Sequence, residues 1–271
     1  MDLIYLLVTY IKDLKMIEIR IFVEGLTERL FVEKILYNYF SNKWIRIFWI
    51  SYHKKKVTSS NIQGYTNLIN APSKPTYCFI IHQCEGVGSI SYQVNQLSLT
   101  TNTFDYLITL RDLSRSIPPP PIKPIDSRAK IEESVKHIKD KITDFDKNTH
   151  KIKSDKLERM EHFFAVMEIE AWFLKEIKFL IKIDDRLTPE YIKQKLDIDL
   201  YNDDVELYKK PSKDLDNIYK RVGLTYNKRE DKGEEIVKYL DYDQLFTNAR
   251  KDMPHLNNLI EFIENCNCIT E

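Results

Sequence analysis

The sequence predicts an α/β protein built on a mostly parallel β-sheet flanked by helices, and two observations indicate this class. Strand-like apolar segments alternate with helix-like segments from residue 17 to about residue 174, which is the pattern of a doubly wound sheet. After that point, apolar residues recur at the i, i+3, i+4, i+7 spacing of amphipathic helices, as in Leu215, Ile218, Tyr219 and Val222. We therefore expect a sheet with a helical insertion and a helical C-terminal part.

The first predicted unit is a strand, a turn and a helix. Apolar and charged residues alternate from Ile17 to Val23, as in a strand, and Glu24-Gly25 forms the turn. Thr27 is placed to cap the helix that follows, and Glu28 lies in its first turn, where the helix dipole favours a carboxylate.

Further strands follow along the chain. We expect them over residues 45–50, 76–82 and 105–110, with a helix over about 89–97. Gly86-Val87-Gly88 precedes that helix and predicts a tight turn, because a Gly-x-Gly sequence is a weak signal for phosphate binding.

An insertion is predicted next. Four prolines at 118–121 form a stiff spacer, and a lysine-rich helix is expected from Arg128 to about Phe145. The sheet resumes at Phe163–Met167. The predicted divisions are an N-terminal extension, the two parts of the sheet domain with the insertion between them, and a C-terminal helical segment: 1–15, 16–116, 117–161, 162–240 and 241–271.

Composition narrows the class of protein. The 41 basic and 41 acidic residues cancel, which argues against a protein that coats nucleic acid or membrane over its whole surface. The apolar run of residues 3–11 is shorter than the roughly 20 residues of a membrane helix, and its flanking charges do not fit a signal peptide. Four cysteines do not make a disulfide scaffold and are expected to be reduced thiols, so we expect a cytoplasmic protein without membrane contact.

Carboxylates follow the predicted strands. They are Glu24, Glu85, Asp112, Glu168 and Glu170. In open parallel sheets the functional crevice lies beyond the carboxyl ends of the strands, where these groups would repel one another unless cations lay between them. Hard oxygen ligands suit Mg²⁺ or Mn²⁺, and two such ions can hydrolyse a phosphodiester without a protein nucleophile.

The run Val23-Glu24-Gly25-Leu26-Thr27-Glu28 resembles the Val-Glu-Gly-x-Thr-Glu signature of TOPRIM domains, in particular the OLD-like branch. Three later segments resemble further family motifs in the same order. Residues 108–112 resemble the strand that carries the first aspartate of the Asp-x-Asp motif. Residues 167–172 are similar to a Glu-x-Glu-Ala-Trp segment, and residues 226–228 to a Tyr-x-Lys segment. The resemblance implies a TOPRIM, Rossmann-like fold and a partner ATPase of the ABC or SMC-like type, encoded nearby in phage-defence loci.

By the same resemblance, Glu24 binds metal or serves as general base, Asp112 is a metal ligand, and Lys228 stabilises the transition state. Glu168 or Glu170 would then hold a second ion. Ser114 stands where the family motif has its second aspartate. Because a serine does not supply that charge, metal affinity should fall unless Glu85, Glu168 or Glu170 compensates.

Each of these residues also has a simpler interpretation. Glu24 and Glu170 could serve only as helix starts, Asp112 as a turn former, and Lys228 as a solvated loop residue. The basic loop within residues 41–59 is the expected contact with nucleic acid, although it could also serve only to keep the protein soluble. Two arginines after the 105–110 strand are added to it. The predicted contacts are therefore Lys54, Lys55, Lys56, Arg111 and Arg115.

These features predict a Mg²⁺- or Mn²⁺-dependent DNA nuclease, with endonuclease action favoured, working with an ATPase in antiviral defence. Two other functions stay open: a TOPRIM ribonuclease that processes structured RNA, and a non-catalytic regulatory or nucleic-acid-binding subunit whose site has decayed. Ser114 and the neutral net charge motivate the latter. A homodimer is left open as well.

Overall fold

A computed structural model describes residues 16–40, 45–61, 65–66, 77–100, 104–113, 127–227 and 232–266. The chain forms two compact units. Unit 1 comprises the described residues within 1–111 and 138–162, and unit 2 those within 112–137 and 163–271. The predicted N-terminal extension, 1–15, and the proline spacer, 118–121, lie outside the described residues.

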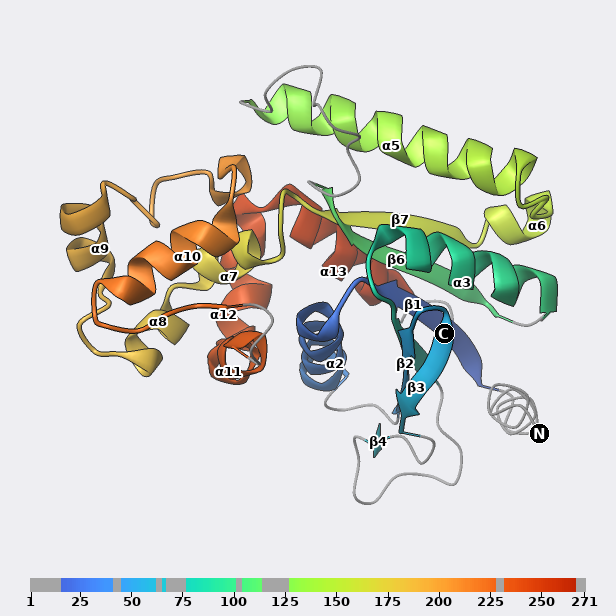
Figure 1. The fold of residues 1–271 in the computed structure, drawn as a ribbon, viewed down its shortest axis with the longest axis horizontal. Coiled ribbons are helices and arrows are strands. Elements are labelled where there is room, and N and C mark those ends of the chain that lie inside the picture. Colours follow the sequence, from blue (N-terminus) through green and yellow to red (C-terminus); the bar gives the residue numbers. More distant parts are fainter. Residues whose placement is uncertain are drawn as a thin grey trace. The chain divides into compact units, whose positions relative to one another are not determined.

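The sheet is the framework of unit 1 (Figure 1). Its strand order is β3-β2-β5-β1-β6-β7, and β4 pairs separately with β2. The strands are β1 Ile17–Val23, β2 Ile45–His53, β3 Lys56–Ser60, β4 Tyr65–Thr66, β5 Tyr77–Gln83, β6 Tyr106–Asp112 and β7 Met160–Ala165.

The centre of the sheet is parallel. β1 pairs in parallel with β5 on one side and with β6 on the other, and β5 pairs in parallel with β2. Only β3 and β4 run antiparallel to their neighbour β2 among the pairings described in register. The predicted α/β class, a mostly parallel sheet flanked by helices, is therefore confirmed.

Two helices cover opposite faces of this sheet. Helix α2 (Leu26–Tyr39) lies on the face that presents Phe79, because Phe40 at its end packs on that ring with 5.3 Å between centroids. Helix α3 (Val87–Thr100) covers the other face, where its Ile90 and Val94 join Ile80 in one buried cluster. Since neighbouring residues of a strand point to opposite faces, both faces are apolar and the sheet is buried between helices.

The predicted insertion helix is present as α5 (Arg128–Asn148), and it is followed by the short α6 (Ser154–Leu157). The part of α5 from residue 138 onward belongs to unit 1, whereas residues 128–137 belong to unit 2. The strand predicted at 163–167 is observed three residues earlier, as β7.

Unit 2 is otherwise helical. Its helices are α7 Glu170–Glu176, α8 Lys178–Ile183, α9 Pro189–Leu196, α10 Pro211–Lys220, α11 Lys232–Tyr239, α12 Tyr242–Thr247 and α13 Pro254–Cys266, with 3₁₀ turns at Val205–Leu207 and Ala249–Asp252. Trp172, Phe173 and Phe179 are fully buried and contribute the largest side chains of its core. Trp172 is thus a core residue.

Two smaller expectations can be compared with the structure. Cys78 and Cys84 are free, buried thiols. None of the helices in the described ranges has both the length and the apolar character needed to cross a bilayer.

Candidate functional site

Glu24 occupies the predicted position at the carboxyl end of β1, where it is almost completely buried. The turn after β5 is hydrogen-bonded to it: the amide of Cys84 donates to the Val23 carbonyl at 2.8 Å, and the amide of Gly86 donates to the Glu24 carbonyl at 3.3 Å. The ends of two central strands therefore meet at Glu24.

Gly25 makes room for a second carboxylate beside Glu24. A Cβ atom added to Gly25 would lie 2.9 Å from Oε2 of Glu28, which is shorter than real Cβ contacts. Glu28 is also buried, in the first turn of α2. The Glu-Gly-x-Thr-Glu spacing thus has a local physical reason, because the glycine lets the Glu28 side chain fold back over the helix start.

Arg111 supplies the positive charge of this region. Arg111 is 2% exposed, and burial lowers its pKa to about 10, opposed by the charges of Asp146 and Glu24. Arg111 is still protonated at neutral pH. Its guanidinium also donates to Thr109 and Ser91 at 3.3 and 3.4 Å. We predicted a surface contact with nucleic acid for Arg111, and the structure instead places it inside as a counter-charge.

Asp112 is the last residue of β6 and is buried. Leu110 pairs with Val23 in the sheet, so Asp112 lies two residues beyond that pairing at the carboxyl end of its strand. This is the position predicted for it.

Asp146, on α5, is a buried carboxylate that sequence reasoning did not select. Burial raises its pKa, opposed by the hydrogen bond with His150 at 2.9 Å and by the charge of Arg111. No local signal marks it, because it lies in a polar segment interpreted as an insertion.

The basic loop forms the tight turn between β2 and β3, and it reaches the turn after β5. His53 shares a 2.6 Å hydrogen bond with Glu85, and this bond is the main cause that lowers the pKa of Glu85. The ammonium group of Lys55 lies 4.3 Å from the centre of the Tyr92 ring on α3. Lys54 and Lys55 adopt left-handed φ values of 46° and 68°, which cost energy for residues other than glycine.

The hairpin turn therefore holds exposed lysines beside the carboxyl end of β5. Glu85 is half exposed and already engaged with His53. The structure thus links the hairpin, the turn after β5 and Glu24 within unit 1.

In unit 2, the side chain of Glu168 contacts the first turn of α10. Its Oε2 accepts a hydrogen bond from the amide of Ser212 at 2.9 Å, so the carboxylate faces the positive end of that helix dipole. Met167, directly before it, has a left-handed φ of 60°, an uncommon conformation that sets the direction of the chain between β7 and α7.

Glu170 is fully buried at the start of α7 and accepts a hydrogen bond from the hydroxyl of Tyr226 at 2.7 Å. Glu170 of the Glu-x-Glu-Ala-Trp segment is thereby joined to Tyr226, the tyrosine of the Tyr-x-Lys segment. Lys228 lies two residues after Tyr226, outside the described residues, as do Ser114 and Arg115.

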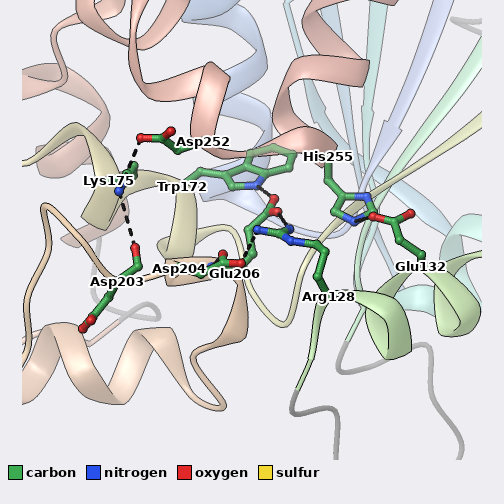
Figure 2. Close-up of polar contacts among 9 residues, drawn as sticks. All are labelled: Arg128, Glu132, Trp172, Lys175, Asp203, Asp204, Glu206, Asp252 and His255. Atoms are coloured by element: carbon green, nitrogen blue, oxygen red, sulfur yellow. Dashed lines mark hydrogen bonds and ion pairs between the residues drawn. The ribbon is translucent and has the colours of Figure 1, made fainter.

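A polar cluster fixes the other side of the Glu-x-Glu-Ala-Trp segment (Figure 2). The indole N–H of Trp172 donates to Glu206 at 3.2 Å, and Arg128 forms ion pairs with both Glu206 and Asp204. Glu206 is fully buried, and its burial raises its pKa, opposed mainly by the charges of His255 and Arg128. Neither Arg128 nor Glu206 was selected from the sequence, because their partners are distant along the chain.

The same cluster holds the 200–206 loop against α7. Nζ of Lys175 donates to the carbonyl groups of Tyr201 and Asp203 at 3.1 and 3.4 Å and lies 3.5 Å from the Asp252 carboxylate (Figure 2). The loop is therefore tied down at several points.

Metal-binding capacity was assessed from the same side chains. In the part of the chain that the structure describes, no three His, Cys, Asp or Glu side chains are gathered closely enough to bind an ion by themselves. The described carboxylates at strand ends are hard oxygen donors, which suit Mg²⁺ or Mn²⁺ better than zinc.

Comparison with known proteins identifies one family. The family model described as a domain of unknown function, DUF4276, matches residues 23–264. No curated protein matches the chain significantly, and no solved structure does. The matched range begins directly before Glu24 and contains all the candidate site residues.

Proposed function

We propose that this chain, which belongs to the DUF4276 family, is a metal-dependent nuclease that hydrolyses phosphodiester bonds in DNA. One observation carries the proposal: the buried Glu24, at the end of a central parallel strand, is hydrogen-bonded through its backbone to a turn that also contacts a lysine-bearing hairpin. A carboxylate site beside a positive surface is the arrangement that phosphodiester hydrolysis requires.

The donor groups fit a hard divalent cation. Mg²⁺ is commonly held by one or two carboxylates and completes its shell with water and substrate phosphate, so Glu24 and Asp112 at the ends of β1 and β6 suffice in number. When bound, such an ion polarises the phosphodiester and lowers the pKa of its water. Glu85, Glu168 and Glu170 remain the proposed further ligands.

The chain's own residues prepare this chemistry. Arg111 places a buried positive charge near the Glu24 carboxylate and so balances its negative charge. Lys54, Lys55 and Lys56 are exposed and attract the phosphate backbone. Lys228 is proposed, from the resemblance alone, to stabilise the developing charge on the phosphate.

The partners are also part of the proposal. The resemblance to OLD-like TOPRIM proteins favours an ABC or SMC-like ATPase partner, a cytoplasmic setting and a role in antiviral defence. DNA is the proposed substrate, and RNA would offer the same phosphodiester chemistry. Zero net charge implies that the partner or the metal supplies much of the field that holds DNA.

A non-catalytic nucleic-acid-binding subunit is the second candidate, and Arg111 favours it. Because this guanidinium already offers a buried cation to Glu24 and Asp146, the carboxylates do not require a metal ion for charge balance.

The test is a nicking assay on supercoiled plasmid. The purified chain, alone and with its ATPase, is expected to nick plasmid in Mn²⁺ and to stop when EDTA removes the ion. Nicking that continues in EDTA would contradict metal dependence. Mn²⁺-dependent binding of DNA without any nicking would favour the non-catalytic subunit.

A further inference from the structure

Unit 2 contains a pocket that the proposed nuclease chemistry does not use. Its volume is ≈ 560 Å³, within the range of pockets that bind small ligands. It lies between the end of α9, the loop before α10 and the first turns of α10. Because all of its lining belongs to one stretch of unit 2, its shape depends only on that unit.

Three exposed lysines line the pocket: Lys209, Lys210 and Lys213. Among the ion pairs that the described residues form, none includes these three ammonium groups. Other lysines nearby are paired, since Lys193 contacts Asp199 at 2.5 Å and Lys220 contacts Asp216 at 2.5 Å. The pocket lysines are therefore available to an anionic ligand.

The lining also holds three carboxylates, Asp197, Asp203 and Asp214, so its formal charges balance. Asp203 is engaged, because it accepts hydrogen bonds from the Tyr208 hydroxyl at 2.8 Å and from the Asp199 amide at 3.0 Å. The pKa of Asp214 is raised by its burial and by the nearby negative charge of Glu168. Removing the charge of Asp214 would leave the lining with a net positive charge.

The helix start at α10 does not by itself account for anion binding. The Ser212 amide is already bonded to Glu168, and the amides of Lys213 and Asp214 bond to the Lys210 carbonyl. Recognition must come from the lysine side chains, with the Tyr208 ring as an apolar wall.

The pocket also adjoins a predicted site residue. Glu168 holds the first turn of α10, and its charge acts on Asp214 in the pocket lining. We propose that this pocket binds a phosphate ester, carried by a nucleic-acid strand or by a free mononucleotide, through Lys209, Lys210 and Lys213. The choice of nucleic acid as the source rests on the proposed function, whereas the phosphate chemistry rests on the pocket alone.

The proposal is tested by binding in EDTA, so that cleavage plays no part. Fluorescence anisotropy with labelled 5′-phosphorylated pentathymidylate measures affinity for the wild-type chain, Lys213→Gln and Asp214→Asn. We expect Lys213→Gln to weaken binding about tenfold and to reduce the salt dependence by about one counterion. Asp214→Asn should tighten binding, because it removes a negative charge from the lining.

Lys220→Gln is the matched control. It removes an exposed lysine from the same helix, but one that pairs with Asp216 outside the pocket lining, and it should leave binding unchanged. Equal affinity in the wild type and Lys213→Gln, or weaker binding by Asp214→Asn, would overturn the proposal. Competition with thymidylate and with inorganic phosphate separates the sources: full competition by thymidylate identifies a mononucleotide site, and competition by oligomer alone identifies a strand-binding site.

This outcome is independent of nuclease activity. If the wild-type chain does not bind the oligonucleotide in EDTA but still nicks plasmid in Mn²⁺, the pocket proposal is refuted and the nuclease proposal stands. Binding without nicking would do the reverse.

Discussion

Replacing Glu24 by glutamine is expected to reduce Mn²⁺-dependent plasmid nicking by at least about 10³-fold, whether Glu24 binds the ion or takes a proton from water. Glutamine keeps the size of the buried side chain and its hydrogen-bonding capacity, so the fold should persist. The change removes only the negative charge that the proposed chemistry uses. Initial nicking rates at saturating Mn²⁺, with circular dichroism to confirm folding, measure the effect.

Glu33→Gln is the control for this experiment. Glu33 is a buried carboxylate on the same helix, α2, and burial raises its pKa to about 7, so its neutral form is already accessible. The Glu33 variant should nick plasmid at the wild-type rate. Equal nicking by the wild type and by Glu24→Gln would indicate a contaminating nuclease and remove the support for catalysis.

Replacing Arg111 by methionine is expected to lower the free energy of unfolding by about 3 kcal/mol or more. Methionine has similar length but no charge, so Glu24 and Asp146 would be left as buried carboxylates without their cation. Equilibrium unfolding in urea measures the loss. Should this variant fail to fold, Arg111→Lys offers a milder change, in which the charge remains and only the guanidinium hydrogen bonds to Thr109 and Ser91 are lost.

A double mutant tests the reason for that loss. If Arg111 acts as the counter-charge of Glu24, then Glu24→Gln should restore at least about 1 kcal/mol to the Arg111→Met chain, because it removes a buried carboxylate whose charge Arg111 no longer balances. Additive effects of the two substitutions would show that Arg111 does not act through Glu24.

The local parts of the fold could be predicted from the sequence. The bounds of β1 agree with the alternation from Ile17 to Val23, and Glu24 stands at its end. The cap expected at Thr27 is wrong, because α2 begins at Leu26 and its N-cap residue is Gly25. Gly25 lies in the turn expected after β1, and its steric role beside Glu28 became visible only in the structure. The strand and the turn depend on neighbouring residues, which is why pattern reasoning could find them.

Features that depend on distant residues were not predicted. β3 forms because its residues 56–60 pair with β2. Most of its side chains are exposed, and its sequence has few apolar residues that would predict a strand. Arg111 was expected to contact nucleic acid because it follows the 105–110 strand, and its burial beside Glu24 and Asp146 depends on residues distant along the chain. Helices α8 and α9, of six and eight residues, are too short for a clear periodic pattern.

Anomalous diffraction from a crystal soaked in Mn²⁺ is the most direct test of a metal-dependent site at the end of β1. The proposal predicts a manganese peak about 2.1 Å from a carboxylate oxygen of Glu24 in the wild type, and none there in Glu24→Gln crystals. A well-soaked wild-type crystal with manganese elsewhere but none at Glu24 would contradict the metal-dependent nuclease and favour a binding subunit whose carboxylates are neutralised by Arg111.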